Sequence, residues 1–470
     1  MIRRASAAML VAAAVSCAPK VKYTPPAPVA PAAYRENAGW KPAQPSDQAV
    51  RGAWWELYGD PDLDALEARV EISNPTLRAA AARYAEARAV LRGARADLYP
   101  EVGASPSVGA FQPSGNRATS PFHDRYGDFL LPASVSYEPD LWQRLRGTVA
   151  ASRASAQATA ADLENGRLSL HAELAIDYFT LRGVDREQDL LDRAVASFER
   201  ALELTNNRFQ GGLASQADVA LAETQLETTR AQAADVGVVR AALEHAMAVL
   251  VGQSASEFSL PAAPRTAEPI VVPAGLPSEL LERRPDVAGA ERRMAAANAR
   301  LGVAESAYYP ILSLTGSAGF ESSSIAKLVT SVSTFWSAAP TLALTVFDAG
   351  RRRAAADQAR AVYDETLADY QASVVEAFRE VEDQLAALRV LAGEAAIQQR
   401  AVDAAERSLA QATNRYRGGL VSYLEVTSAQ SVALNNERTA VDLLTRRLTA
   451  SVLLIKALGG GWTAAQIPAP

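Results

Sequence analysis

The 470-residue chain has little of the chemistry on which enzymes and metalloproteins depend. It contains one cysteine, Cys17, and three histidines. A disulfide within one chain is therefore excluded, and a metal site or a cysteine nucleophile in the body of the chain has few residues to draw on. Aromatic residues make up only 7% of the sequence, and the 47 basic and 53 acidic residues form no basic block. Nucleic-acid binding therefore has little support.

Residues 1–16 are predicted to form a secretory signal peptide. Two arginines precede a mostly apolar stretch that is too short to span a membrane as a helix. Residues 14–17 resemble a bacterial lipobox, in which the cysteine thiol receives diacylglycerol after export, although Ala14 stands where leucine is usual. The alternative is ordinary cleavage with Cys17 incidental. We favour lipidation of Cys17, because the only thiol of the chain lies where that chemistry needs it.

The segment after the signal is rich in proline and contains no long apolar run. Residues 17–50 carry seven prolines without a period, which predicts an extended, lipidated tether. No apolar run that could serve as a transmembrane helix follows. Any membrane crossing must then use strands in a closed barrel.

The sequence of the body repeats itself. Residues 208–213, which contain a pair of glycines, match residues 415–420 at an offset of 207 residues. The Tyr99-Pro100 pair matches Tyr309-Pro310 at an offset of 210 residues. Concordant offsets over most of the chain predict a tandem duplication of one structural unit.

Each half is predicted to contain a long helical hairpin. Residues 143–207 and 351–414 contain no proline. Apolar residues in these helices follow the 3–4 spacing of a coiled-coil seam, and each helix could reach roughly 95 Å at 1.5 Å per residue. Glycine adopts the left-handed conformation that a helix end needs, so the glycine pairs end these helices. The hairpin tips are therefore placed at residues 208–215 and 415–422, and the return helices follow them.

Strand-like sequence precedes each long helix. Alternation of large with small or polar residues predicts strands at 101–111 and 129–141 in the first half and at 311–321 and 336–347 in the second. One such segment alone fits a soluble β-hairpin. Two hairpins in an exported, otherwise helical chain favour the strands of a membrane barrel. Four strands do not enclose water, so a pore requires several copies of the chain.

The predicted fold class is mainly α with a membrane β-barrel part, built from two long coiled-coil hairpins and four strands per chain. Because the two tips are built and placed alike, we expect them to form one working end. The predicted segments are a signal peptide (1–16), a lipidated tether (17–50), a first repeat (51–255), a linker (256–275), a second repeat (276–458) and a C-terminal tail (459–470).

A set of short motifs in a fixed order relates the chain to a known family. The motifs are Trp54-Trp55-Glu56-Leu57-Tyr58-Gly59-Asp60, Asn74-Pro75-Thr76-Leu77, Ser136-Tyr137-Glu138-Pro139-Asp140-Leu141-Trp142, Glu282-Arg283-Arg284-Pro285-Asp286-Val287, Tyr309-Pro310 and Arg415-Tyr416-Arg417-Gly418-Gly419-Leu420. Each motif is modest alone, but their order on a duplicated frame is specific. With them the chain resembles the TolC-like outer membrane factor family, in particular its lipidated efflux branch of the OprM and NodT type.

The resemblance implies a homotrimer in the bacterial outer membrane. Three chains with four strands each would form a twelve-stranded barrel, and the helices would continue it as a tube into the periplasm, tapering to a gate at the glycine tips. The implied partners are outer membrane lipid, a periplasmic adaptor (membrane fusion) protein and an inner-membrane transporter of the proton-driven RND type or the ABC type. The implied function is a passive exit duct for drugs or other small molecules, without a cofactor.

Two other functions stay open at this point. One is an outer membrane duct for type I protein secretion, and the other is a periplasmic coiled-coil scaffold without a pore. The lipobox and the motif at residues 282–287 favour efflux over protein secretion. An enzyme is not expected. Residues 324–327 do match the Ser-x-x-Lys motif of penicillin-recognising enzymes, but the other motifs of those enzymes are missing from the sequence.

Side chains around the glycine tips are the candidate gate, because charged rings at a constriction select ions and hold a pore shut. Relatives often carry aspartate at the position of Ser428, so an acidic ring is assigned here to Asp218 or Glu425, which match at the offset of 207. The alternative is that these are solvated charges at helix ends. The gate candidates are Asp218, Glu223, Tyr423, Glu425, Arg415 and Arg417.

The same tips are the candidate docking site for an adaptor. A tip without large side chains lets a helical hairpin of the adaptor approach closely. The alternative is that the glycines only end the helices. The docking candidates are Arg208, Gly211, Gly212, Gly418, Gly419 and Leu420.

Overall fold

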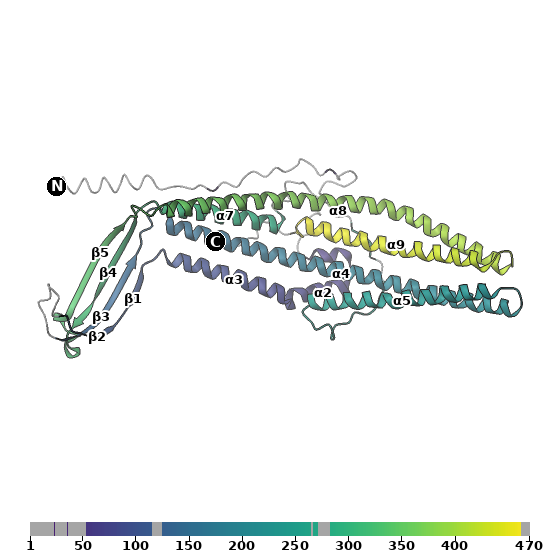
Figure 1. Ribbon diagram of the computed structural model, residues 1–470, viewed down its shortest axis with the longest axis horizontal. Coiled ribbons are helices and arrows are strands. Elements are labelled where there is room, and N and C mark those ends of the chain that lie inside the picture. Colours follow the sequence, from purple (N-terminus) through teal and green to yellow (C-terminus); the bar gives the residue numbers. More distant parts are fainter. Residues whose placement is uncertain are drawn as a thin grey trace.

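The computed structural model describes residues 23, 35, 53–114, 125–264, 267–270 and 283–461. The predicted signal peptide, Cys17, most of the tether, part of the linker and most of the C-terminal tail lie outside the described residues. Figure 1 shows an elongated molecule, with helices along most of its length and one sheet at one end.

Two helical hairpins of equal size form the body of the molecule. The first consists of α4 (Arg144–Gln210) and α5 (Gln216–Leu250), and the second of α8 (Arg351–Arg417) and α9 (Tyr423–Ala457). The outgoing helices α4 and α8 have 67 residues each, and the return helices α5 and α9 have 35 each. Both tips lie at the end of the molecule opposite the sheet (Figure 1). The duplicated hairpins predicted from the repeat offsets are confirmed.

Shorter helices complete each repeat. α3 (Pro75–Ala96) packs along α4, and α7 (Pro285–Ser306) packs between α4 and α8; both have 22 residues. In the first repeat, α2 (Pro61–Ser73) and the 3₁₀ helix η2 (Trp54–Tyr58) precede α3. None of the helices in the described ranges has the length and apolar character that a membrane-crossing helix needs.

Local chemistry explains where α2 and α3 begin. The Asp60 carboxylate accepts hydrogen bonds from the first-turn N–H groups of α2 at 3.0 and 3.4 Å, and the Asn74 side chain accepts one from α3 at 2.9 Å. Pro61 and Pro75 follow these caps at the first helical position, where the missing N–H costs nothing. The two Asx-Pro pairs are therefore true helix starts.

One antiparallel sheet contains strands from both repeats. Its order is β1-β3-β4-β5, and β2 also pairs with β3. β4 extends the predicted strand 311–321 by one residue. The strands are β1 (Glu101–Ala104), β2 (Ser107–Phe111), β3 (Tyr126–Tyr137), β4 (Ile311–Ser322) and β5 (Thr334–Ala343).

The strand predicted at 101–111 is divided into two pieces, which corrects that prediction. β1 and β2 keep one register along β3, with Ala104 opposite Ala133 and Ser107 opposite Leu130. The interruption contains Pro106 on one side and lies opposite proline on the other. Proline has no N–H to donate, so the ladder of hydrogen bonds breaks there without shifting the register.

The strands predicted at 129–141 and 336–347 begin and end too late in the sequence. β3 and β5 each end four residues earlier. The residues beyond them serve the next helix instead: Asp140 accepts hydrogen bonds from the first turn of α4 at 2.9 and 3.1 Å, and Asp348 accepts one from the first turn of α8 at 3.2 Å. Side chains that cap a helix in this way compete with continuation of the strand.

The largest hydrophobic core joins the two repeats midway along the helices. It contains residues of η2, α2 and α4 together with residues of α8 and α9. A separate, small cluster lies at the tips. The buried side chains of the main core include Trp54, Leu63, Tyr178, Leu181, Val381, Leu385 and Ile455.

Candidate functional site: the sheet and the helical tips

The sheet has two chemically different faces. Residues directly opposite each other on antiparallel strands point to the same face, so the register assigns each side chain to a face. One face of the sheet is rich in serine, threonine and glycine, with Ser134, Ser317 and Ser337 in one row across three strands. This face also carries a few large apolar residues, among them Leu130, Ile311 and Phe335. The apolar face comprises Val102, Val108, Phe129, Leu131, Val135, Leu312, Leu314, Phe320, Trp336 and Leu342.

The apolar face is exposed in the single chain. Trp336 is 79% exposed, Val108 is 75% exposed and Leu342 is 66% exposed. Figure 1 shows the sheet extending beyond the ends of the helices. A continuous exposed apolar face marks a surface that contacts lipid or another chain. Alternation of an apolar and a polar side along each strand is typical of strands with one lipid-facing and one water-facing side.

The two hairpin tips have the same backbone geometry. Gly212 and Gly419 have φ of 71° and 73°, in the left-handed region that favours glycine. The N–H of Leu213 donates to the Arg208 carbonyl at 2.8 Å, and that of Leu420 donates to the Arg415 carbonyl at 2.9 Å. Each helix thus ends in a Schellman-type turn. The first glycine of each pair has an ordinary negative φ, so only the second is required by the backbone.

Arg208 of the first tip binds the end of α8 in the second hairpin. Its Nη1 donates to the Tyr416 carbonyl at 2.8 Å and to the Arg417 carbonyl at 3.3 Å. The guanidinium carbon lies 4.6 Å from the centre of the Tyr416 ring, and the Tyr416 hydroxyl donates to Thr205 Oγ1 at 3.2 Å. A cation at a helix C-terminus satisfies carbonyls that have no partner in the helix and complements the helix dipole. Arg208 therefore joins the two tips of one chain.

Asp218 caps the N-terminus of α5, close to the contact between the two tips that Arg208 makes. Its Oδ2 accepts hydrogen bonds from the Ser215 N–H at 2.9 Å and from the Ser215 hydroxyl at 2.8 Å, and the Asp218 N–H returns one to that hydroxyl at 3.2 Å. This is a reciprocal capping box. The Ser215 N–H above all, and then the Ser215 hydroxyl, the Tyr423 N–H and the charge of Arg208, lower the pKa of Asp218 below its ordinary value. Asp218 is therefore a charged group between the tips.

The second tip carries the equivalent pair on an exposed side. Arg415 and Glu425 stand 207 residues after Arg208 and Asp218, and Arg415 Nη1 lies 2.7 Å from Glu425 Oε1. Their side chains are 53% and 42% exposed. A groove of about 600 Å³ adjoins this pair and is also lined by Ser428. The first pair is thus engaged within the chain, whereas the second faces outward.

The other predicted gate residues fall into two environments. Tyr423 is only 1% exposed and packs edge-on against Tyr416 at 5.3 Å between ring centres, so its side chain supports the tip from inside. Glu223 and Arg417 are exposed. Sequence reasoning missed Tyr416, which joins the tips. It also missed Leu213, whose equivalence to the exposed Leu420 at the repeat offset was the available signal.

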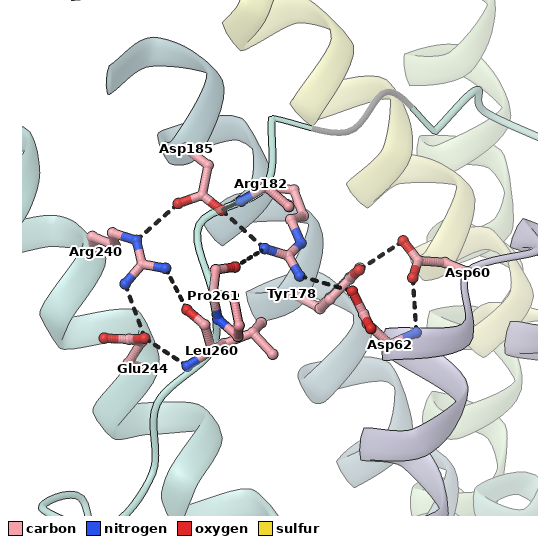
Figure 2. Close-up of polar contacts among 10 residues, drawn as sticks. Asp60, Asp62, Tyr178, Arg182, Asp185, Arg240, Glu244, Leu260 and Pro261 are labelled. Carbon is pink, nitrogen blue, oxygen red and sulfur yellow. Dashed lines mark hydrogen bonds and ion pairs between the residues drawn. The ribbon is translucent and has the colours of Figure 1, made fainter. Parts of the chain in front are cut away.

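A buried charged cluster fixes the start of the linker to the first hairpin (Figure 2). Arg182 Nη1 donates to Asp185 Oδ2 at 3.0 Å and to the Pro261 carbonyl at 2.8 Å. Arg240 Nε donates to Asp185 Oδ1 at 2.8 Å, and its Nη2 donates to the Leu260 carbonyl at 2.6 Å. Two cations therefore share one buried carboxylate. Over the part of the chain that the structure describes, no group of three or more histidine, cysteine, aspartate or glutamate residues is arranged to hold a metal ion.

An amphipathic sheet at one end of two long helical hairpins defines a channel subunit that joins a membrane to a helical conduit. A family model described as "Outer membrane efflux protein" matches residues 66–253 and 276–460, which lie in the first and second halves of the chain. The chain belongs to the outer membrane efflux protein family.

Individual relatives agree with this family over nearly the whole chain. The solvent efflux pump outer membrane protein SrpC of Pseudomonas putida is 33% identical over 421 residues, which cover 87% of this chain and 88% of SrpC. The toluene efflux pump outer membrane protein TtgC of Pseudomonas putida is 30% identical over 442 residues, which cover 93% and 91%. The solved outer-membrane channel OprN matches with a TM-score of 0.88 at 29% identity, covering 95% of this chain and 100% of that chain. The protein is an outer membrane efflux channel that extends into the periplasm.

Proposed function

We propose that three copies of this chain form one closed duct, which serves as the exit of a tripartite efflux system. The observation that carries the proposal is the sheet, with its exposed apolar face and its two open edges. β1 and β2 lie at one edge, and β5 lies at the other. Pairing β5 of one copy with the β1–β2 edge of the next removes every edge and closes a barrel. Three copies supply about twelve strands, with the apolar face toward lipid.

The proposed partners are a periplasmic adaptor and an inner-membrane transporter of the RND or ABC type. Relatives named as efflux pump components support this assignment. The tips offer a docking surface, because Leu213 and Leu420 occupy equivalent positions and are 72% and 74% exposed. A side chain added at Gly212 would meet open space, so the tip is accessible to an approaching helix. Six such tips would surround the mouth of a trimer.

The proposed cargo is small apolar or amphipathic molecules, conducted without catalysis. Relatives named for solvent, toluene and antibiotic efflux support this cargo class. Lipidation of Cys17 would anchor each chain to the outer membrane, and mass spectrometry of the mature N-terminal peptide tests it. An unmodified cysteine, or a mature chain that begins elsewhere, would show that the anchor is absent.

The tips are proposed as the gate. In a ring of six hairpins, the second hairpin of each chain faces the first hairpin of the next copy. Arg415 would then cap the end of α4 in that copy, as Arg208 caps the end of α8 within the chain. Asp218 and Glu425 would supply the acidic charges of the ring. The closed mouth is thus held by one kind of contact, used three times within chains and three times between them.

Single-channel conductance in planar bilayers tests the duct and its gate. The purified protein is expected to conduct, and Arg415→Ala, Asp218→Ala and Glu425→Ala are each expected to raise its open-state occupancy and drug entry into cells. Asp235→Ala is the matched control, because Asp235 is exposed on the same helix as Asp218 but is not a gate candidate, and it is expected to leave both readouts unchanged. A protein that conducts identically in all variants would contradict the gate. A protein without conductance would contradict the duct and favour a periplasmic scaffold.

A further inference from the structure

The two outgoing helices have different neighbours within one chain. α4 packs against α3 and α5 of its own repeat and also against α7 and α9 of the second repeat. Among the described elements, α8 packs extensively only against α7 and α9 of its own repeat. Figure 1 shows α8 along one side of the helical body, with α3 and α5 along the other. If the two repeats pack alike, the missing neighbours of α8 are α3 and α5 of another copy.

An ion pair that joins the repeats within the chain has an equivalent on these outer helices. Arg293 of α7 donates to Asp162 of α4 at 3.0 and 3.1 Å. α3 and α7 have 22 residues each and align at the offset of 210 residues, and α4 and α8 align at 207. The equivalent residues are therefore Arg83 on α3 and Asp369 on α8, and both are exposed in the single chain. The offsets thus reproduce the opposite charges.

A polar contact within the chain becomes an apolar pair on the outer helices. Arg300 of α7 donates to Ser155 of α4 at 3.1 Å. The equivalent residues are Val90 on α3 and Val362 on α8, which are 58% and 36% exposed. Large apolar side chains that stay exposed at matching positions indicate a surface that another chain covers.

A second apolar pair lies closer to the tips. A side chain added at Gly183 of α4 would overlap Thr445 of α9, so these two positions are in contact. The equivalent residues are Val390 on α8 and Val238 on α5, which are 53% and 68% exposed. The contact positions come from α4, α7 and α9 alone, so the exposure of these valines is an independent observation. Four exposed valines on three helices thus form two matched pairs.

The interface between copies would be more apolar than the interface within the chain. Glu187 of α4 binds Arg438 of α9 at 2.8 Å, but Ala231 of α5 stands at the position of Arg438. Val90 and Val238 would meet a serine and a glycine on α4 of another copy, whereas they meet valines on α8. The apolar pairs therefore favour a ring in which first and second repeats alternate.

We propose that α8 of one copy packs on α3 and α5 of the next copy, in the register that the repeat offsets define. The contacts are Arg83 with the partner's Asp369, Val90 with the partner's Val362 and Val238 with the partner's Val390. α3 precedes β1 and α8 follows β5, so the helices join the same two copies as the strand edges of the barrel. Because it rests on the proposed trimeric duct, the interface occurs three times around the ring.

Cysteine cross-linking of the detergent-solubilised protein tests the register. Val90→Cys combined with Val362→Cys is expected to give dimers and trimers on denaturing gels after treatment with a short bismaleimide. Val90→Cys combined with Val375→Cys is the matched control, because Val375 is 68% exposed on the same helix but lies roughly 20 Å along it from Val362. This control and each single variant, which also tests any contribution of Cys17, are expected to stay monomeric.

Charge reversal gives a second measurement of the same register. Arg83→Asp and Asp369→Arg each place like charges opposite each other, so each is expected to lower the temperature at which the trimer dissociates on electrophoresis by several degrees. The two changes combined are expected to restore that temperature. Arg83→Asp combined with Asp357→Arg is not expected to restore it, because Asp357 is exposed at a different position of α8.

Light scattering of the solubilised protein measures the number of copies separately. A trimer in which Val90→Cys with Val362→Cys links no better than the control pair would overturn the register and leave the duct function standing. So would a trimer in which the combined charge reversal restores nothing. A protein that stays monomeric and does not conduct would overturn both the register and the duct.

Discussion

The two hairpins have the same dimensions but different interiors. α4 and α8 both contain 67 residues and end in the same glycine turn. Arg182 and Asp185 of α4 are 5% and 4% exposed, whereas Arg389 and Ala392, which stand 207 residues later on α8, are exposed. α4 and α8 have equal lengths because both run from the sheet to the tips. Arg182 and Asp185 of α4 are buried because residues 260–263 pack over them.

This difference predicts where the molecule tolerates changes of charge. A buried ion pair adds little to stability when intact, because desolvation offsets the attraction, but removal of one partner strands the other charge. Exposed pairs contribute about 0–1 kcal/mol. Removal of the buried charge of Asp185 on α4 should therefore destabilise the protein, whereas the exposed positions of α8 that match Arg182 and Asp185 should tolerate substitution.

The largest expected effect is that of Asp185→Ala. Asp185 accepts hydrogen bonds from Arg182, from Arg240 and from the Ala263 N–H, the last at 3.0 Å. Its removal takes away the buried carboxylate that both guanidinium groups share, and leaves Arg182 with Asp62 at 3.3 Å and Arg240 with Glu244 at 2.9 Å. The expected loss is about 3–5 kcal/mol of unfolding free energy. Urea unfolding of the solubilised protein, followed by circular dichroism, measures it. Asp189→Ala on the same helix, whose partner Arg193 is 69% exposed, is expected to cost under about 1 kcal/mol. Equal losses for the two variants would contradict the comparison.

The second prediction concerns a position at which the repeats agree. Gly252 and Gly459 follow the return helices 207 residues apart, with φ of 70° and 90°, and a Cβ at either would overlap a backbone carbonyl of Ser73 or Arg283. Replacement by alanine combines left-handed strain of about 1–2 kcal/mol with overpacking of about 1–3 kcal/mol. Gly252→Ala and Gly459→Ala are therefore expected to lower the unfolding free energy by about 2–5 kcal/mol each.

The tip glycine provides the control for that prediction. Gly212 has φ of 71°, but a Cβ there would meet nothing within 4 Å. Gly212→Ala should therefore cost only the strain, about 1–2 kcal/mol. The same urea titration compares the three variants. A tip variant as unstable as the other two would show that crowding is not the cause.

The sequence was sufficient for the architecture because the architecture is periodic. Heptad spacing, proline-free helices and repeat offsets predicted two matched hairpins, and the comparisons confirm the family and the efflux function. The ends of the strands were harder to predict from the sequence. Asp140 and Asp348 look like the polar ends of strands in sequence, but their carboxylates bind helix N–H groups, and only the fold decides between these roles.

The contacts between distant residues could not be predicted. Arg208 was expected at a docking surface, and its bond to the Tyr416 carbonyl joins residues 208 positions apart. Glu67 and His171 are 104 residues apart and resemble ordinary charged positions on amphipathic helices. The repeat offset does not indicate the Glu67–His171 pair, because Phe378 stands on α8 where α4 has His171. The roles of Asp218, Glu425 and Arg415 as a gate stay predictions.

The third prediction uses the titration of Glu67 on α2, whose partner His171 on α4 is replaced by Phe378 at the matching position of α8. Burial raises its pKa from 4.5 to about 7 in the folded state, so the folded protein holds its proton more tightly than the unfolded chain. The resulting stabilisation is fully present below pH 4.5 and is lost as the pH rises through 7. Relative to Glu67→Gln, the wild-type protein should lose on the order of 3 kcal/mol over this range.

Unfolding free energies measured at a series of pH values check this prediction. Groups that titrate in both proteins, such as Asp177, cancel in the difference between wild type and Glu67→Gln. Glu203→Gln, at an exposed position of the same helix as His171, should follow the wild-type curve. Parallel curves for wild type and Glu67→Gln would contradict the raised pKa, and a wild-type stability that rises with pH relative to Glu67→Gln would contradict its sign.

The smallest effects are expected at the tips, where they distinguish the roles of two equivalent arginines, Arg208 and Arg415. Arg208 caps the end of α8 and lies over the Tyr416 ring, so Arg208→Ala should lower the unfolding free energy by about 1–2 kcal/mol. Arg415 pairs with Glu425 at an exposed site, so Arg415→Ala should lower it by under about 1 kcal/mol. If Arg415 instead joins neighbouring copies, its removal should lower the temperature at which the trimer dissociates on electrophoresis, with Arg208→Ala closer to wild type. Equal dissociation temperatures for Arg415→Ala and wild type would remove Arg415 from that contact, and the equivalence of the two tips would then end at the backbone.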